Sequence, residues 1–240
     1  MPRISFLCGA PHSGEPQMEA QDLVAAPPRL VIWSGPNGSG KTTCYEHRKQ
    51  THPSAVPAAL VNADVIALHY AQRLGYANVN ELPAKLRSLV ELKAGKQALR
   101  HRAALLAART SFTLETTASS PRILNLIAQA QAQGYLVELN FVYLPTVELN
   151  LERIAQRVQQ GGHSVPEAVV RRRYPKAMAL MPQLLWAAQR SCLIDNSRNA
   201  TVVWQQQDGH VTLSAHPELN WTGARLTELL ARAQPKLALS

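Results

Sequence analysis

The chain alternates between short apolar runs and longer segments in which apolar residues recur every three or four positions. Short apolar runs bounded by turn residues predict strands, and the three-to-four spacing predicts helices. The predicted strands cover 30–34, 60–62, 111–115, 135–144 and 192–195. The predicted helices cover 41–50, 65–74, 83–109, 121–133, 147–160 and 166–189. Strand followed by helix in this order indicates a mostly parallel sheet with helices on both faces.

The C-terminal part of the chain adds a different pattern. The stretch "TVVWQQQDGHVTLSA" alternates on both sides of Asp208-Gly209, which predicts a β-hairpin at the edge of the sheet. A final helix is predicted over about 222–233. The expected fold class is therefore α/β, a three-layer sandwich with a C-terminal hairpin edge.

Length and composition favour one domain. The chain has 240 residues, 46% of them apolar, which is enough to bury one substantial core. Residues 1–28 contain Gly, Pro and polar residues without periodicity and predict a flexible N-terminal arm before a domain over 29–240. The three cysteines lie far apart, which favours a reducing compartment and no structural zinc. Without an apolar run of membrane-spanning length, we expect a cytoplasmic protein with no membrane partner.

The stretch "LVIWSGPNGSGKTT", residues 30–43, carries the strongest chemical signal. An apolar strand enters a glycine-rich turn with the P-loop spacing GxxxxGK[ST], in which backbone N–H groups and a helix N-terminus converge on phosphate oxygens. Lys41 is expected to reach the outer phosphates of ATP, and the Thr42 hydroxyl to ligate Mg²⁺. The predicted nucleotide-binding residues are Gly35, Pro36, Asn37, Gly38, Ser39, Gly40, Lys41, Thr42 and Thr43.

Two further strand ends carry polar residues. Ligands of parallel sheets bind at the carboxyl ends of the strands, so residues directly after strands are candidates for chemistry. In "LVNADVIA", Asp64 can cap the following helix or can take a proton from an acceptor hydroxyl. In "SFTLETTASS", Glu115 and the two threonines that follow stand at a strand end, where turn-forming residues are also common.

The net charge of +9 is concentrated in two segments. Residues 85–102 hold six Lys/Arg against one Glu, and residues 153–190 hold seven against one. Such segments are typical of a solvated helix face, of a nucleic-acid surface, or of a site that neutralises phosphate charge. Aromatic residues make up only 5% of the chain and are not interleaved with the basic runs, so nucleic acid is an unlikely partner.

The second basic segment contains a glycine pair between two helices. Gly161-Gly162 separates a helix that ends near Arg157 from a helix with three consecutive arginines at 171–173. This arrangement favours a mobile lid over about 150–176 that brings arginines to the transferring phosphate and excludes water. A solvated helical hairpin is the alternative. Neighbouring helical residues diverge by about 100°, so the three arginines cannot all face one site.

The ordered motifs resemble the zeta toxin family of P-loop kinases, specifically its shorter bacterial members. The resemblance runs from about Leu30 to Ser197 and rests on "GPNGSGKTT", "VNAD", "AGKQALRHRAALLAARTSFTLETT", "GYLVELNFVYL", "RVQQGGHSVP", "RRRY" and "DNS". It implies a P-loop kinase-like fold that uses ATP and Mg²⁺ to phosphorylate a sugar hydroxyl of a nucleotide sugar, UDP-N-acetylglucosamine. It also implies a toxin that is inhibited by a separate antitoxin chain.

The resemblance implies roles for individual residues. The implied catalytic residues are Asp64 as the base, Lys41, Arg157, and one of Arg171 and Arg172 as the second phosphate clamp. The implied acceptor-binding residues are Asp64, Lys96, Glu115, Thr116 and Thr117, with Thr116 where the larger family members have glycine. Asn196 of "DNS" is implied in nucleotide binding, and Thr42 in binding Mg²⁺.

Other P-loop proteins share part of this pattern. An ABC-type or signalling NTPase would have the same loop, and "CLIDN" could be a Walker B strand that ends at Asp195, but the chain has no LSGGQ-like or NKxD motif. A nucleic-acid kinase, or a nucleic-acid-binding NTPase, would use the two basic segments as a phosphate track. This second class is the main alternative to a kinase of a nucleotide-linked metabolite.

Overall fold

The computed structural model describes residues 26–213 and Leu230. The strands are β1 (Arg29–Ser34), β2 (Ala59–Val61), β3 (Phe112–Thr116), β4 (Leu136–Tyr143), β5 (Arg190–Asp195), β6 (Thr201–Gln207) and β7 (His210–Leu213). The helices are α1 (Lys41–Thr51), α2 (Ala63–Arg73), α3 (Ala84–Ala107), α4 (Arg122–Ala132), α5 (Val147–Gln159) and α6 (Glu167–Ala187). Two short 3₁₀ helices are η1 (Pro53–Ala55) and η2 (Val79–Glu81).

The seven strands form one sheet in the order β2-β3-β1-β4-β5-β6-β7. The first five strands pair in parallel, and β6 and β7 add an antiparallel edge. Asp208 and Gly209 both have positive φ, 50° and 83°, as a tight two-residue hairpin turn requires. The predicted α/β class, the parallel sheet and the hairpin edge are confirmed. The predicted N-terminal arm lies outside the described residues except for its last three, and the predicted final helix does so except for Leu230.

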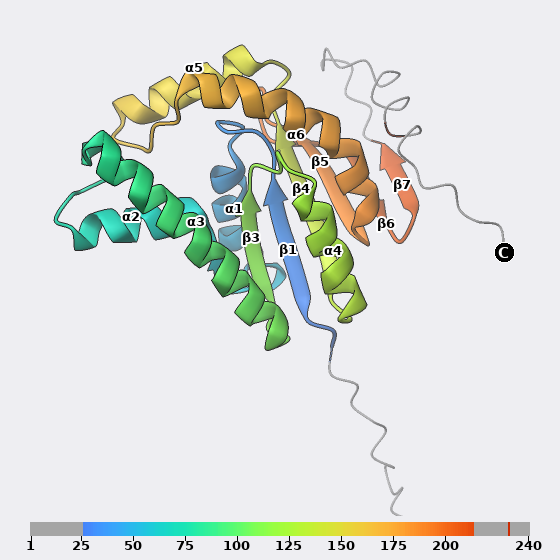
Figure 1. Cartoon of the computed structure of the whole chain (residues 1–240). Helices are drawn as coiled ribbons and strands as arrows, with labels where there is room; N and C mark the ends of the chain where they lie inside the picture. The colour runs from blue at the N-terminus through green and yellow to red at the C-terminus, as the bar shows by residue number, and fades with distance from the viewer. Residues whose placement is uncertain (1–25, 214–229, 231–240) are drawn as a thin grey trace, which may run out of the picture.

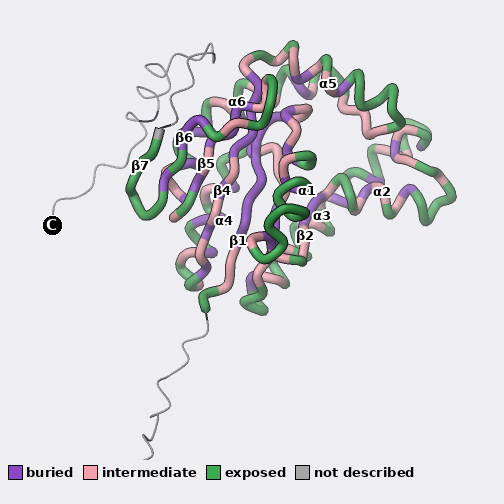
Figure 2. The backbone as a smooth tube through the Cα atoms, turned by 180° about the vertical axis from the view of Figure 1, so that it is seen from behind, coloured by how far each residue is buried: buried purple, intermediate pink, exposed green. Residues whose placement is uncertain are grey.

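Helices cover both faces of the sheet. Figure 1 shows α4 and α6 in front of the strands and α1 behind them. The alternation along β1 explains this arrangement, because successive side chains point to opposite faces. Leu30 and Ile32 pack in the large core under α4 and α6, whereas Val31 and Trp33 pack with Tyr45 of α1. The buried middle strands run through the centre of the molecule in Figure 2.

Helices α2 and α3 form an arm beside the sheet. They pack on each other through a separate small cluster of Ala67, Ala71, Val79, Leu82, Val90 and Ala94. Only the C-terminal part of α3 joins the main core, through Leu106. In Figure 1, α5 and the start of α6 arch over the sheet toward this arm.

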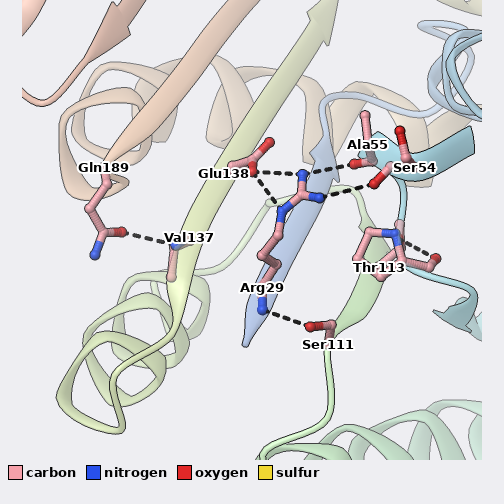
Figure 3. A network of polar contacts seen from close by, with 9 residues as sticks. Arg29, Ser54, Ala55, Ser111, Thr113, Val137, Glu138 and Gln189 are labelled. Atoms are coloured by element: carbon pink, nitrogen blue, oxygen red, sulfur yellow. Dashed lines mark hydrogen bonds and ion pairs between the residues drawn. The ribbon is translucent and has the colours of Figure 1, made fainter. Parts of the chain in front are cut away.

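A polar network fixes the strands at the end of the sheet opposite the P-loop (Figure 3). The Arg29 guanidinium donates to Glu138 Oε1 of β4 at 2.8 and 3.0 Å and to the Ala55 carbonyl of η1 at 2.8 Å. The Arg29 amide donates to Ser111 Oγ beside β3 at 2.9 Å. These bonds join three strands, so the register of β1 between its neighbours is set at this end.

The strand order indicates which edge of the sheet can bind a ligand. The chain moves from β1 to β2 on one side of the sheet and later to β4 on the other, so the direction of winding reverses at β1. Crevices at such switch points, at the carboxyl ends of the strands, are where α/β proteins bind ligands. The P-loop follows β1 directly at this edge. Within residues 26–213, no helix combines the length and the apolar character that crossing a membrane requires.

Candidate active site

Close contacts with the surrounding chain require glycine at the tight positions of the P-loop. A Cβ on Gly35 would lie 1.9 Å from the Val142 carbonyl oxygen, and one on Gly38 would lie 2.4 Å from the Asn150 carbonyl oxygen. Gly40 has φ of 92° and is the N-cap of α1. Any side chain at these positions would push the loop away from the strands and helix that hold it.

Side chains from distant segments hold the loop from outside. Asn150 of α5 is fully buried, and its Nδ2 donates to the Asn37 carbonyl at 2.7 Å. Asn196 Nδ2 donates to the Ser39 carbonyl at 2.9 Å, and Arg153 donates to the Asn196 carbonyl at 2.6 Å. Asn196 therefore lies beside the P-loop, and its role in nucleotide binding stays a prediction. Asn150 and Arg153 were missed, although a polar residue on the apolar face of a predicted helix is a signal that could have found Asn150.

Lys41 is buried at the centre of the loop. Its Nζ donates to the Pro36 carbonyl at 2.9 Å, and the residue is only 7% exposed. Burial lowers the pKa of Lys41, while the negative charges of Glu115 and Asp64 raise it and the Arg157 charge lowers it further. The predicted base Asp64, acceptor-site Glu115 and lid residue Arg157 therefore all lie near enough to Lys41 to influence its charge, although they come from α2, β3 and α5.

Glu115 connects the P-loop to the neighbouring strand. Thr42 Oγ1 donates to Glu115 Oε1 at 2.9 Å, and Asn62 Nδ2 donates to Glu115 Oε2 at 2.9 Å. Desolvation raises the pKa of Glu115, opposed by the Lys41 charge and by the Thr42 hydrogen bond. Asp195 cannot take the position of Glu115 beside Thr42, because β5 is separated from β1 by β4. Its Oδ1 instead accepts a hydrogen bond from the Ser197 amide at 2.7 Å.

Asp64 is free of the helix-capping role that was its alternative interpretation. The N-cap of α2 is Asn62, whose Oδ1 accepts from the Asp64 amide at 2.8 Å and from the Val65 amide at 3.4 Å. Helix α2 begins at Ala63, two residues before the predicted start, so Asp64 lies in its first turn with an exposed side chain. A helix cap was expected in this segment and is present, but the capping residue is Asn62 and not Asp64.

The lid arginines differ in their surroundings. Arg157 donates to the His163 carbonyl at 2.6 Å, and a Cβ on Gly162 would lie 2.5 Å from Arg157 Cγ, so the glycine makes room for this side chain. Arg171 instead forms surface ion pairs with Glu167 at 2.7 Å and Glu148 at 3.0 Å. The structure thus does not bring Arg171 to Lys41. Arg172 is exposed on α6, and its role in phosphate binding stays a prediction.

The acceptor-site threonines line a pocket of about 300 Å³ between α3 and the end of β3. Glu115, Thr116 and Thr117 form one wall. Lys96 lies outside this lining and is exposed on α3, whose Gly95, Ala98, Leu99 and Arg102 face the pocket instead. A second, larger groove of about 1140 Å³ is lined by α1, β4, β5 and β6, and Thr43 and Asn196 stand at its P-loop end.

A side-chain amide joins the loop of the predicted lid to the α2–α3 arm. Asn80 of η2 donates from Nδ2 to the Gly162 carbonyl at 2.8 Å and accepts at Oδ1 from the Ser164 amide at 2.9 Å. Nothing in the sequence around Asn80 signals this contact, because its partner lies 82 residues away. The two bonds join the arm that carries Asp64 to the loop that follows Arg157.

Replacing Asn80 with alanine is expected to loosen the lid. Two neutral hydrogen bonds contribute about 0.5–1.5 kcal/mol each, so we expect proteolysis and amide exchange within 160–166 to increase by about tenfold while the sheet stays protected. Limited proteolysis and hydrogen-exchange mass spectrometry measure both quantities. Asn125→Ala, on the exposed face of α4, is the matched control. Equal exchange in the two variants would contradict the tie.

Fold and site together define a P-loop nucleotide-binding protein with the zeta-toxin-like kinase fold that the motifs predicted. A family model described as "AAA domain" matches residues 30–175, and the chain belongs to this family. An uncharacterized protein of Haemophilus influenzae is 29% identical over 146 residues, which are 61% of this chain and 92% of that protein.

Two solved structures show the same fold at low sequence identity. AvrRxo1-ORF1:-ORF2 with ATP gives a TM-score of 0.60 at 19% identity over 89% of this chain, and the match spans only 65% of that chain. A structure of the PezAT chromosomal toxin–antitoxin system of Streptococcus pneumoniae gives 0.56 at 16% identity, over 86% of this chain and 88% of that chain.

Proposed function

We propose that this protein is an ATP-dependent kinase that phosphorylates a sugar hydroxyl of UDP-N-acetylglucosamine and acts as the toxin of a toxin–antitoxin system. The observation that carries the proposal is that Glu115, which accepts a hydrogen bond from Thr42 of the P-loop at 2.9 Å, also lines the pocket formed with Thr116 and Thr117 at the carboxyl edge of the sheet. A phosphate-binding lysine and a metal-binding acid are sufficient to bind the nucleotide, and a kinase adds to them a pocket that holds the acceptor hydroxyl and a carboxylate that takes its proton. The similar PezAT structure belongs to a toxin–antitoxin system, which supports a separate antitoxin partner.

The P-loop residues would bind the phosphates of ATP. The backbone N–H groups of the loop and the N-terminus of α1 supply partial positive charge, and Lys41 adds a full charge that forms no ion pair with a carboxylate of the described residues. Burial destabilises the charged form of the Lys41 ammonium group, and contact with the outer phosphates of ATP would stabilise that charge again. The nucleotide base would lie toward Thr43 and Asn196.

Thr42 and Glu115 fit a magnesium ion. A hydroxyl and a carboxylate oxygen 2.9 Å apart beside the phosphate site are the hard oxygen ligands that Mg²⁺ prefers. When bound, Mg²⁺ neutralises charge on the β- and γ-phosphates. Glu115 would also orient the acceptor, since it lines both the P-loop and the acceptor pocket.

Asp64 would accept the proton of the attacking hydroxyl. It is a solvent-accessible carboxylate that caps no helix, and its charge acts on both Lys41 and Glu115. Thr116 and Thr117 would position the sugar so that its hydroxyl points to the γ-phosphate. The lid would then exclude water from the transfer, held closed by Asn80.

The direct test is incubation of the purified protein with ATP, Mg²⁺ and UDP-N-acetylglucosamine, followed by mass spectrometry of the nucleotide sugar. A panel of other nucleotide sugars, sugar phosphates and oligonucleotides runs beside it. A phosphorylated UDP-N-acetylglucosamine is the expected product. A phosphorylated oligonucleotide end without any phosphorylated sugar would instead support the nucleic-acid kinase alternative.

Replacing Arg157 with alanine is expected to lower turnover by about 100-fold or more, with ATP affinity reduced only a few-fold. The guanidinium would donate to the transferring phosphoryl group, and such bonds strengthen as charge develops in the transition state. Steady-state kinetics combined with equilibrium ATP binding separates the two effects. Arg73→Ala, exposed at the end of α2, is the control. An equal loss in turnover and binding would reduce Arg157 to a binding residue.

A further inference from the structure

The acceptor pocket contains more positive charge than a neutral sugar needs. Its lining includes two arginines, Arg102 of α3 and Arg122 at the start of α4, against one carboxylate, Glu115. Glu115 is engaged by Thr42 and Asn62 and faces Lys41, so its charge is balanced at the P-loop end. The positive charge of the two arginines is therefore available to a ligand in the pocket.

Arg102 is half-buried without compensation. Within residues 26–213, its guanidinium forms no ion pair and donates no hydrogen bond, and desolvation alone lowers its pKa. The partly buried guanidinium groups of Arg29, Arg87 and Arg153 all donate to carbonyl or carboxylate oxygens. A charge withdrawn from water without a partner destabilises a fold, so a group of this kind is explained by a ligand that supplies the missing partner.

The wall facing Arg102 is built for hydrogen bonding to an anion. Thr116 at the end of β3 and Thr117, Ser119 and Ser120 in the loop before α4 place four hydroxyls in the pocket lining. The N-terminus of α4 adds the positive end of a helix dipole beside Arg122. Ala118, in the middle of this loop, is buried with φ of 49°, a strained conformation of the kind that concentrates at ligand sites.

We propose that Arg102 and Arg122 are specificity-determining residues that bind a phosphate group carried by the acceptor. The phosphate is that of a sugar monophosphate or the diphosphate of a nucleotide sugar. A volume of about 300 Å³ is at the small end of ligand pockets and fits a sugar ring with a phosphate attached. The proposal rests on the proposed kinase function for the identity of the ligand as acceptor.

Binding in the absence of ATP tests the phosphate subsite. The probes are N-acetylglucosamine, N-acetylglucosamine 1-phosphate and UDP-N-acetylglucosamine, titrated by calorimetry into wild type, Arg102→Gln, Arg122→Gln and the control Arg100→Gln. Arg100 lies on α3, two residues from Arg102, and is exposed outside the pocket. We expect wild type to bind at least one phosphate-bearing probe more tightly than the neutral sugar, and Arg102→Gln to weaken that binding by about tenfold or more.

The two charged probes distinguish a phosphate monoester from the diphosphate of a nucleotide sugar. Tight binding of the 1-phosphate means that a monoester is sufficient, and binding of the UDP sugar alone means that the diphosphate is required; both support the subsite. Equal affinity for the neutral sugar and for the charged probes, equal effects of Arg102→Gln and Arg100→Gln, or no binding of any probe would overturn it. If the charged probe binds in an Arg102-dependent way but receives no phosphoryl group from ATP, the kinase function fails and the subsite stands.

Thermal stability separates a ligand-binding arginine from a structural one. Without ligand, Arg102→Gln is expected to melt at the same temperature as wild type or higher, because it removes a desolvated charge that has no protein partner. Saturating charged probe should raise the melting temperature of wild type more than that of the variant. Arg102→Lys keeps the charge and should retain part of the probe affinity. A lowered melting temperature without ligand, together with unchanged probe affinity, would show that Arg102 is structural.

Discussion

Replacing Lys41 with methionine is expected to abolish phosphoryl transfer and ATP hydrolysis without lowering the melting temperature. Within residues 26–213, the Nζ atom of Lys41 donates a hydrogen bond only to the Pro36 carbonyl of its own loop, and burial disfavours its charge. Methionine keeps the length of the stem and removes this desolvated charge. The positive charge that would hold the outer phosphates is lost, so we expect turnover to fall by at least about 1,000-fold.

The measurements are ATP turnover and thermal melting of the two proteins. Lys49→Met, at the exposed end of the same helix, is the control for removing one lysine from α1. A melting curve across pH adds a second check. Because the pKa of Lys41 is lowered in the fold, the unfolded chain binds more protons just below its ordinary pKa of 10.5, so wild-type stability should gain from raising the pH toward that value. Lys41→Met should lose this contribution. A well-folded variant with wild-type turnover would refute nucleotide binding by this loop.

Replacing Asp64 with asparagine is expected to leave ATP and acceptor binding intact and to reduce product formation by about 100-fold or more. Asparagine keeps the size of the side chain and removes its basicity, so the proton of the attacking hydroxyl has no acceptor. The cap of α2 is Asn62, so the variant retains its cap and loses only the interaction of a first-turn carboxylate with the helix dipole, about 0.3–1 kcal/mol.

Single-turnover kinetics with mass spectrometry of the product measure this effect. Asp208→Asn, in the distant hairpin turn where asparagine also tolerates positive φ, is the control for loss of one carboxylate. Near-normal product from Asp64→Asn would remove the base from the mechanism. A wild-type protein that labels an acceptor other than UDP-N-acetylglucosamine would keep the kinase function and replace its substrate.

Sequence reading succeeded where the signal is local. The spacing of Gly35, Gly40 and Lys41 defines the P-loop by itself, because the approach of a phosphate to backbone N–H groups is a property of consecutive residues. The Asp208-Gly209 turn is local in the same way, since both residues must adopt positive φ. The boundary of α2 was displaced by two residues, because asparagine and aspartate are both good N-caps and only the backbone conformation of Asn62 decides between them.

The sequence by itself determined the fold class and the phosphate-binding loop, because each depends on periodicity or on neighbouring residues. Only the tertiary structure decided that Glu115 meets Thr42, that Asn80 joins the loop after Arg157 to the arm, and that Arg102 rather than Lys96 lines the pocket beside Thr116 and Thr117. The partners in the first two contacts are 73 and 82 residues apart in the chain. Strand order brings Thr42 and Glu115 together, and the rotation of α3 by about 100° per residue turns Lys96 out of the pocket and Arg102 into it.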